Sequence, residues 1–364
     1  MNDVRVLRFG GSSFATPADY REVASYLHAR VRSGERLVVV VDGMAGATER
    51  LRRLALAVNP AASASALNNL LPMAGTAGAG LLRVALEAQY ISARQLLAHG
   101  NGLTSEPPGG RAARLLGWDP APVRAALANH PIVVLAGGQA ADMDRRPAWL
   151  GENSADLSAV ALAVALGLDE CELYADRDGV YSADPRLVPD AVLLPEPRAA
   201  DVVTMASRGA RVPHPGAVEL AAGHGVRLVC RLGRGHLGRG SVIARDGTPV
   251  HAVVADLRSA VVELGTPETA QRLYEELVEA RLPAHLLRTP HGRWVVAVTG
   301  GQVDVAGFLA RHRLPGRLTG ERLVTEVRAG RVVSHLAADA VAARALATHL
   351  HRVLRLPGPS LAAA

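Results

Sequence analysis

The chain has 364 residues, of which 49% are hydrophobic and 20% are charged, and this aliphatic content excludes disorder as a description of the whole chain. The length exceeds what one core usually needs, so we expect two domains. All 40 basic residues are arginine, against 34 acidic residues, which gives a formal net charge of +6. Acidic residues are interleaved throughout and aromatic residues make up only 3%, so this excess does not indicate a nucleic-acid partner. The absence of lysine fits a compositional bias of the source genome.

Two cysteines, Cys171 and Cys230, are too few for a disulfide framework, which favours a reducing compartment. The N-terminal stretch lacks the long apolar segment of a signal peptide. The longest apolar runs, residues 37–41 and 157–168, are too short for a bilayer, which needs about 20 residues. We therefore expect a cytoplasmic protein without a membrane partner.

The first 180 residues alternate apolar strands with amphipathic helices. Residues 18–32 have helical apolar spacing after Thr16 and Pro17, which offer a capping hydroxyl and a proline for the first turn. Further helices are predicted at 81–97 and 158–166, with a loop at 100–117. Predicted strands lie at residues 4–7, 37–41, 131–136 and 172–175. Strand–helix–strand units with glycines after the strands predict an open, mostly parallel sheet sandwiched by helices.

The pattern changes near residues 238–246. The strands predicted beyond this point are 251–256, 260–264, 284–287, 294–298 and 323–327, and the helices are 268–280, 303–312 and 338–354. Paired strands around amphipathic helices predict a smaller α+β region. The predicted domains are therefore residues 1–245 and 246–356, followed by a flexible tail at 357–364.

Gly10, Gly11, Ser12 and Ser13 follow the first strand directly. Glycines let backbone N–H groups approach an anion, and Arg8 adds a positive charge beside them. Taken alone, this pattern is more often an ordinary turn than an anion-binding site. A second glycine-rich turn from Asp42 to Thr48 and a third at residues 137–138 strengthen the binding-site interpretation, because such loops converge at the carboxyl edge of a parallel sheet.

Residues 174–186 combine three acids, two arginines and two tyrosines after a predicted strand. Without further context, a polar surface hairpin explains this segment equally well. Residues 207–215 precede a predicted helix at 217–222, and Arg211 within them is either a phosphate contact or a solvated residue at the helix entry.

These segments together resemble the aspartokinases of the amino acid kinase family. The family pattern Lys-Phe-Gly-Gly-Thr-Ser is similar to residues 8–13, and Asp-Val-Asp-Gly-Val-Tyr-Thr-Ala-Asp-Pro-Arg is similar to residues 176–186. Gly-Ala-Lys-Val-Leu-His-Pro is similar to residues 209–215, and Leu-Gly-Arg-Gly-Gly-Ser-Asp to residues 150–156. The resemblance covers residues 4–245, and the region beyond it faintly resembles the ACT-type regulatory modules of that family.

The resemblance implies a nucleotide site and a catalytic pair. Gly10, Gly11 and Ser12 would form the phosphate cradle. Arg8 stands at the position of the lysine that bridges the transferring phosphoryl group, and Asp156 at that of the acid that organises the catalytic charges. The residues that the resemblance assigns to the nucleotide are Asp176, Tyr181, Arg186 and Arg211.

The acceptor side departs from the family pattern. Glu152 stands where the family has the arginine that binds the carboxylate of the amino acid, and Thr76 stands at a family glutamate. The remaining residues assigned to this side are Asp42, Thr48, Asn153 and Ser154. Compositional bias explains arginine for lysine at position 8, but it does not explain glutamate for arginine. A carboxylate facing a substrate carboxylate is repulsive, so we expect L-aspartate to be a poor acceptor.

Two hypotheses about function follow, and the first is favoured by Asp156 and the intact 176–186 segment. In the first, the protein is an aspartokinase-like, ATP-dependent phosphotransferase with a changed small-molecule acceptor. In the second, it is an inactive homologue that binds nucleotide and serves as a regulatory or partner subunit. A stand-alone sensor that works through the C-terminal region is a weaker third possibility. Glu152 itself is either a substrate contact or a base.

The resemblance also implies cofactors and partners. ATP is expected together with Mg²⁺, with the phosphates supplying most ligands of the ion. No cluster typical of a protein-held metal is visible in the sequence. The C-terminal region predicts a homodimer formed through sheet edges, with allosteric binding of an amino acid as a further possibility.

Overall fold

The computed structural model describes residues 3–109, 112–233, 239–301 and 303–355. These residues form two compact units. Unit 1 comprises Met1–Gly179 and Gly216–Gly247, and unit 2 comprises Val180–Pro215 and Thr248–Ala364. The division near residue 247 lies close to the predicted boundary, whereas residues 180–215 group with the C-terminal unit. The domain limits 1–245 and 246–356 therefore stay a prediction from the sequence. The predicted flexible tail at 357–364 lies outside the described residues.

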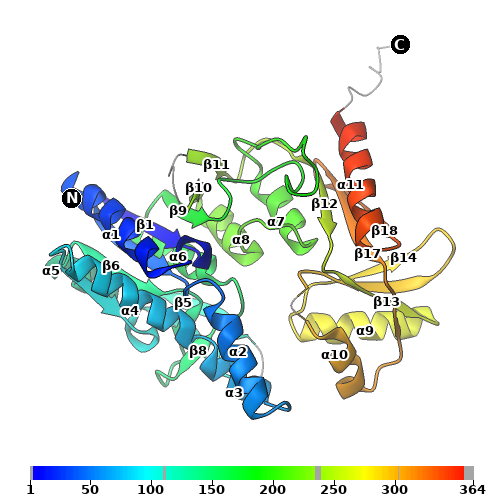
Figure 1. Ribbon diagram of the computed structural model, residues 1–364, viewed down its shortest axis with the longest axis horizontal. Helices are drawn as coiled ribbons and strands as arrows, with labels where there is room; N and C mark the ends of the chain where they lie inside the picture. The colour runs from blue at the N-terminus through cyan, green and yellow to red at the C-terminus, as the bar shows by residue number, and fades with distance from the viewer. Residues whose placement is uncertain (1–2, 110–111, 234–238, 302, 356–364) are drawn as a thin grey trace. The chain divides into compact units, whose positions relative to one another are not determined.

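Unit 1 is built on a seven-stranded sheet in the order β11-β10-β9-β1-β2-β6-β3 (Figure 1). Its strands are β1 (Val4–Phe9), β2 (Arg36–Val41), β3 (Ala93–Leu96), β6 (Ile132–Ala136), β9 (Glu170–Ala175), β10 (Arg227–Leu232) and β11 (Arg239–Ile243). All neighbouring pairs are parallel except β10 with β11. Residues 37–41 of β2 are completely buried, as expected for a central strand covered on both faces.

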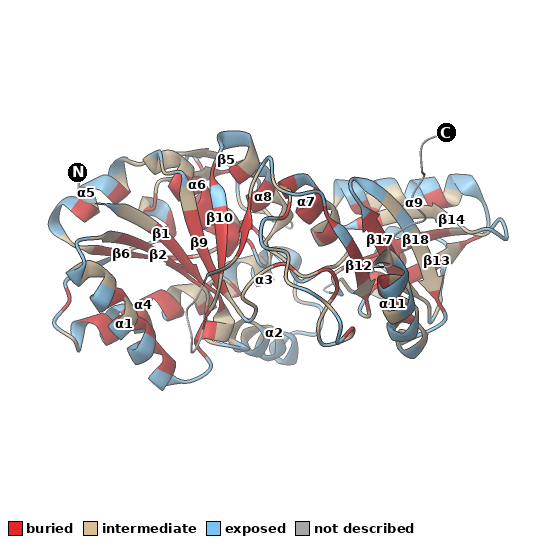
Figure 2. Cartoon of the chain, turned by 90° about the horizontal axis from the view of Figure 1, so that it is seen from above, coloured by how far each residue is buried: buried red, intermediate tan, exposed pale blue. Residues whose placement is uncertain are grey.

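Helix α1 (Pro17–Arg32) shows why the sequence folds locally as predicted. The backbone N–H of Thr16 donates to the carboxylate of Asp19 at 2.6 Å, and Pro17 occupies the first turn. Tyr20, Val23, Ala24 and Leu27 are buried against the sheet, and the helix ends before Gly34, whose φ is +99°. Figure 2 shows the buried strands of this sheet with α1 and α4 (Met73–Glu87) along one face.

The other face of the sheet is covered by α5 (Ala121–Asn129) and α6 (Ala155–Leu166) (Figure 2). Helix α6 is buried nearly all round, as its uniform apolar composition predicts, and it packs on β1, β2 and β9. Because side chains alternate along a strand, Leu7 and Phe9 face α1 while Arg8 faces α6. Cys171 and Cys230 lie buried as free thiols on neighbouring strands β9 and β10.

A small four-stranded sheet in the order β5-β4-β7-β8 completes unit 1 together with the remaining helices. Its strands are β4 (Leu103–Ser105), β5 (Leu115–Trp118), β7 (Gln139–Ala141) and β8 (Pro147–Trp149). The helices are α2 (Ala47–Val58), α3 (Ala64–Leu70) and α8 (Pro215–His224), with short 3₁₀ turns η1 (Gly11–Ser13) and η2 (Ala98–Gly100). The expected loop at 100–117 therefore contains strands, since all of β4 and most of β5 fall within it.

The helix predicted at 81–97 was wrong in its bounds. Helix α4 runs from Met73 to Glu87, and residues 93–96 form edge strand β3. The glycines at 75, 78 and 80 weaken the helical signal in the sequence. Tertiary packing explains the glycine at position 78, because a Cβ there would lie 2.3 Å from the backbone oxygen of Asp42. The helix thus needs a glycine to approach the loop after β2.

Unit 2 contains two antiparallel sheets. The first has the order β12-β17-β18, with β12 (His251–Asp256), β17 (Arg322–Arg328) and β18 (Arg331–Ala337). The second has the order β14-β15-β13-β16, with β13 (Ala260–Leu264), β14 (Ala284–Arg288), β15 (Trp294–Val298) and β16 (Arg317–Leu318). The helices are α7 (Ala199–Ser207), α9 (Pro267–Glu279), α10 (Val305–His312) and α11 (Ala340–Arg355). Most of these elements lie within two residues of their predicted positions, whereas α7, β16 and β18 were not predicted.

The described residues of unit 2 form three apolar clusters, and helices contribute to two of them. Helix α9 buries Ala270, Leu273 and Leu277, spaced three and four residues apart, against the second sheet. Helix α11 packs on the first sheet, and residues 180–192 contribute Ala183 and Val188 to the core beneath it. The predicted fold class, an open and mostly parallel α/β sheet followed by a smaller α+β region, is confirmed. None of the described helices is long and apolar enough to cross a membrane.

Candidate functional site

The strand register of unit 1 brings several loops to one edge of the large sheet. Phe9 pairs with Val41 of β2 and with Tyr174 of β9, and Val41 pairs with Ala136 of β6. The residues that follow these strands, including Gly10 and Asp42, therefore emerge at the same carboxyl edge. Ligands of open parallel sheets bind in the crevice at this edge.

Arg8 is the central charged residue at this edge. Its side chain is buried, and its Nη2 donates to Oδ2 of Asp42 at 2.7 Å. Its Nε lies 3.0 Å from Oδ1 of Asp156, which stands in the first turn of α6. A Cβ added to Gly10 would lie 2.8 Å from Nη1 of Arg8, so the third guanidinium nitrogen is packed against the glycine turn. The predicted catalytic pair, Arg8 and Asp156, is thus in direct contact.

The electrostatics of this cluster are set by two carboxylates around one cation. Burial disfavours the charged form of Arg8, but Asp156 and Asp42 outweigh it, and the pKa of Arg8 is raised. Burial raises the pKa of Asp42, with Arg8 opposing the shift and the charge of Asp156 adding to it. With both carboxylates ionised, the cluster carries a net charge of −1.

Two backbone N–H groups of the glycine turn already donate hydrogen bonds within the protein. The N–H of Gly10 donates to the backbone oxygen of Tyr174 at 2.9 Å, and the N–H of Gly11 bonds to the carboxylate of Asp42. A Cβ on Gly11 would lie 3.0 Å from the backbone oxygen of Gly43. The glycines are therefore required for close packing, and the cradle role of Gly10, Gly11 and Ser12 stays a prediction.

An aromatic cluster lies beneath this turn and was not predicted. The rings of Phe9 and Tyr174 stack with centroids 4.4 Å apart, and those of Phe14 and Tyr20 stack at 4.3 Å. Because Phe9 and Phe14 flank the turn on either side, these rings fix both of its ends. The short spacing of aromatic residues around the glycines was the only sequence signal for this support.

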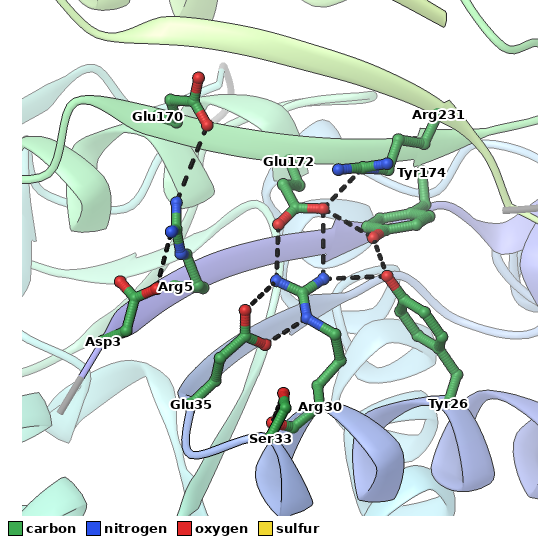
Figure 3. Close-up of polar contacts among 10 residues, drawn as sticks. All are labelled: Asp3, Arg5, Tyr26, Arg30, Ser33, Glu35, Glu170, Glu172, Tyr174 and Arg231. Carbon is green, nitrogen blue, oxygen red and sulfur yellow. Dashed lines mark hydrogen bonds and ion pairs between the residues drawn. The ribbon is translucent and has the colours of Figure 1, made fainter. Parts of the chain in front are cut away.

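Tyr174 continues into a buried polar network at α1 and β9, shown in Figure 3. Its hydroxyl lies 2.6 Å from that of Tyr26 and donates to Glu172 at 2.7 Å. The carboxylate of Glu172 also accepts a hydrogen bond from Nη2 of Arg30 at 2.8 Å. It forms an ion pair with Nε of Arg231 at 2.6 Å (Figure 3). The hydrogen bonds from Arg30 are the leading interactions that overcome burial and lower the pKa of Glu172. Tyr26 and Arg30 are neighbours on α1, and Glu172 and Tyr174 are neighbours on β9. No sequence spacing, however, predicts that these two elements and β10 meet at one network.

The acceptor-side prediction changes in one respect, because Glu152 has a partner. Its carboxylate forms an ion pair with Arg52 of α2, and Glu49 is a second acid close to Arg52. Burial raises the pKa of Glu152, Arg52 opposes this shift, and Glu49 adds to it. Both side chains of the pair are about 30% exposed, and Arg52 offsets the charge of Glu152 only in part, because Glu49 lies close to the same arginine.

The other acceptor-side residues have mainly intramolecular contacts. Thr76 exchanges hydrogen bonds with Gln139, whose amide nitrogen also donates to the backbone oxygen of Pro72 at 2.7 Å. Ser154 is buried, and its hydroxyl donates to the backbone oxygen of Gly151 at 2.6 Å. Asn153 has a left-handed backbone with φ of +58°, and Thr48 is half-buried in the first turn of α2. Gln139 is an addition that the sequence did not point out.

The four predicted nucleotide residues are distributed over both units. Asp176 follows β9 in unit 1 and is exposed. Tyr181, Arg186 and Arg211 belong to unit 2, where Tyr181 forms an isolated bridge with Leu193 and the two arginines are exposed. Their role in nucleotide binding stays a prediction from the resemblance.

The comparisons with known proteins agree with the fold and these motifs. Residues 3–231 match the amino acid kinase family. The aspartokinase of Thermus thermophilus is 35% identical over 256 residues, which are 70% of this chain and 61% of that protein. The aspartokinase of Corynebacterium efficiens is 33% identical over 289 residues, which are 76% of this chain and 68% of that protein.

A crystal structure of Escherichia coli aspartokinase III in complex with aspartate and ADP has the same fold. It aligns with a TM-score of 0.73 at 17% identity, over 96% of this chain and 99% of that chain. The chain thus spans about three fifths of the length of the Thermus relative, while the alignment to the solved structure includes nearly all of it. Together with the match over residues 3–231, these similarities show that the chain belongs to the amino acid kinase family and has aspartokinases as homologues.

Proposed function

We propose that the chain is an ATP-dependent phosphotransferase that transfers a phosphoryl group to a carboxylate or other small-molecule acceptor, and that L-aspartate is a poor acceptor. The observation that supports this most is the guanidinium of Arg8, fixed by Asp42 and Asp156 against the Gly10 turn. Phosphoryl transfer asks a protein mainly for positioning and for positive charge on the phosphate oxygens. A rigidly held arginine at the carboxyl edge of a parallel sheet meets both demands.

ATP is the proposed donor, bound together with Mg²⁺. Among the described residues no group of three His, Cys, Asp or Glu side chains is placed to hold a metal ion. Mg²⁺ is usually bound through one or two carboxylates and the phosphates of its substrate, and Asp42 and Asp156 are carboxylates of this kind. The ion would also offset the net −1 charge of the Arg8 cluster when the triphosphate binds. The proposed nucleotide contacts are Gly10, Gly11, Ser12, Asp176, Tyr181, Arg186 and Arg211.

The acceptor is proposed to present a cationic or neutral polar group toward Glu152. The Arg52–Glu152 pair is neutral overall, whereas the resemblance implies a net positive charge at the position of Glu152. An acceptor carboxylate therefore gains less here than it would from an unpaired arginine. An acceptor that carries both a carboxylate and a cationic group can pair its cation with Glu152 and its carboxylate with Arg52. The proposed acceptor-side residues are Asp42, Thr48, Thr76, Glu152, Asn153 and Ser154.

The alternative is an inactive homologue that binds nucleotide as a regulatory or partner subunit. One observation favours it. Two nitrogens of Arg8 are engaged by carboxylates, so less of its positive charge remains for a transferring phosphoryl group than a lone cation would offer. The two proposals differ in turnover and agree in nucleotide binding.

ADP release from ATP and Mg²⁺ with a panel of amino and hydroxy acids separates the two proposals. We expect turnover that depends on at least one acceptor, with L-aspartate among the slowest. Arg8→Gln should lower turnover by about 100-fold or more. Arg5→Gln is the matched control, because Arg5 lies on the same strand but pairs with Asp3 near the surface. Nucleotide binding without turnover on any acceptor favours the alternative, and neither binding nor turnover contradicts both.

A companion variant tests the acceptor side. Arg8→Lys, Thr76→Glu and Glu152→Arg restore the family pattern, and Arg52→Leu must be added because Arg52 contacts position 152. Aspartate phosphorylation should then appear. If it does not appear in a folded variant that binds ATP, the assignment of the acceptor residues is wrong.

The remaining proposals concern unit 2 and location. We propose that the α+β region acts as an ACT-like regulatory module, that the chain forms a homodimer through it, and that the protein works in the cytoplasm. Strands β14 and β18 lie at edges of their sheets, and such edges are suited to pairing with a second copy. Light scattering of the purified chain tests the dimer, since a monomeric mass contradicts it.

A further inference from the structure

A buried hydrogen bond joins the C-terminal helix to the segment that carries Tyr181 and Arg186. Nε2 of His351 in α11 lies 2.8 Å from Oγ of Ser182. His351 is 1% exposed and Ser182 is 4% exposed, so the bond is excluded from water. The two residues are 169 positions apart in the chain, and both belong to unit 2.

Ser182 is the point at which this segment is held from several sides. Its N–H donates to the backbone oxygen of Val192 at 2.9 Å, and its backbone oxygen accepts from Val253 of β12 at 2.8 Å. Its hydroxyl oxygen also accepts from the N–H of Val192 at 3.0 Å. Only the bond to His351 reaches α11, so this bond links the helix to the polar backbone of the segment.

Helix α11 and the segment also share an aliphatic core. Ala343, Ala347 and His351 follow one another at intervals of four and therefore share one face of the helix. The two alanines belong to the same core as Ala183 and Val188 of the segment. Aliphatic packing tolerates small shifts in position, whereas a buried hydrogen bond specifies one arrangement.

The neighbours of Ser182 are the residues proposed to bind nucleotide. Tyr181 precedes it directly, and Arg186 lies in the turn that follows, where its N–H donates to Oδ1 of Asp184 at 2.9 Å. A displacement of Ser182 therefore moves Tyr181 and the start of this turn together. An error of about 1 Å in such positions is enough to weaken a charged contact substantially.

We propose that His351 is a positioning residue for nucleotide binding, which acts from the C-terminal helix through Ser182 on Tyr181 and Arg186. This inference rests on the proposed nucleotide site, and it adds a residue from the last helix to that site's support. None of the residues that this bond joins or positions is assigned to the acceptor side. Loss of the bond therefore lowers the affinity for nucleotide and leaves acceptor binding unchanged.

The test measures ATP binding by the full chain in the presence of Mg²⁺ with titration calorimetry. His351→Leu should weaken binding about 5- to 20-fold, and His351→Asn, which retains a hydrogen-bonding side chain, should restore part of the loss. His349→Leu is the matched control, because His349 is exposed on the same helix. Where turnover is measurable, the KM for ATP should rise for His351→Leu while kcat at saturating ATP changes less than two-fold.

A second variant guards against loss of folding. Ser182→Ala removes the same bond from the other partner, and thermal unfolding with and without ATP reports both stability and binding. ATP should raise the Tm of the wild type more than that of either variant. Folded variants that bind ATP as tightly as the wild type overturn the inference. A wild type that does not bind ATP contradicts the proposed function instead, so the two failures are distinguishable.

Discussion

The guanidinium of Arg8 contacts carboxylates through two of its nitrogens and packs its third against Gly10. An arginine is bulkier than a lysine and presents a planar fork, so it needs partners on more than one side. Asp42 and Asp156 provide these partners from a loop and from a helix. With both carboxylates ionised, the same geometry leaves the site with an excess of negative charge, which Mg²⁺ bound with ATP would offset in the proposed chemistry.

His285 of β14 provides a residue-scale prediction about pH. Its Nε2 donates to the backbone oxygen of Ser207 at 2.8 Å, and burial, with Arg208 nearby, lowers its pKa to about 4. In the unfolded chain the imidazole of His285 binds a proton near pH 6.5. Between pH 6.5 and 4 the unfolded state therefore holds more protons at this residue than the folded state, and the folded state loses stability as the pH falls. The loss amounts to at most about 3 kcal/mol.

Urea unfolding at pH 7 and pH 5 measures this effect. His285→Gln should reduce the pH dependence between these values by about 2 kcal/mol, because an amide can donate the same hydrogen bond without titrating. His349→Gln, at an exposed position, should leave the dependence as in the wild type. Equal pH dependence in wild type and His285→Gln would show that His285 is not the titrating group.

At the scale of elements, the polar network of Figure 3 connects α1, β9 and β10. Glu172 of β9 is buried between Arg30 of α1 and Arg231 of β10, and its loss would leave two arginines without this shared counter-charge. Removing one member of a buried ionic group typically costs about 3–5 kcal/mol, whereas replacing all members with apolar residues can be nearly neutral.

We therefore expect Glu172→Leu to lower the free energy of unfolding by about 3 kcal/mol in urea titrations. The multiple variant Glu172→Leu, Arg30→Met, Arg231→Leu and Glu35→Gln should recover most of this loss. Glu35 is included because it also pairs with Arg30 and would otherwise lose its partner. Tyr174→Phe, which removes only the hydroxyl between Tyr26 and Glu172, should cost about 1 kcal/mol. A multiple variant less stable than the single variant would argue against the ionic explanation.

At the scale of the whole molecule, the chain does not divide at a single point. Residues 180–215 follow unit 1 in sequence but pack with unit 2, where Ala183 and Val188 contact the core formed with Val253 and Ala347. A fragment that ends at residue 245 therefore exposes apolar side chains that the complete chain buries.

Hydrogen exchange tests this division. In an isolated fragment of residues 1–245, amides of 180–215 should exchange rapidly, while those of β1, β2 and β9 stay protected. The control is the complete chain cut at an inserted protease site after residue 245, in which both pieces are present. Protection of 180–215 should persist in the cut chain and be lost in the fragment. Equal protection in both would contradict the grouping of this segment with unit 2.

Local physical chemistry made many elements predictable. Helix α1 has its cap, its proline and its apolar spacing within one stretch, and β12, β13 and β15 were predicted with the bounds that the structure has. Helix α4 was misplaced because Gly78 weakens a helix locally, although the close approach of Asp42 requires it. The motifs assigned roles to Arg8 and Asp156, but they did not predict that the two side chains form an ion pair.

The sequence by itself determined the alternation of strands and helices, the family resemblance and the residue types at the sheet edge. These properties depend on neighbours within a few positions, and such neighbours are visible in one dimension. Only the tertiary structure decided that Glu152 is paired with Arg52, that Glu172 joins two arginines, and that His351 holds Ser182. These partners are about 60 to 170 residues apart in the sequence, and their meeting depends on how whole elements pack.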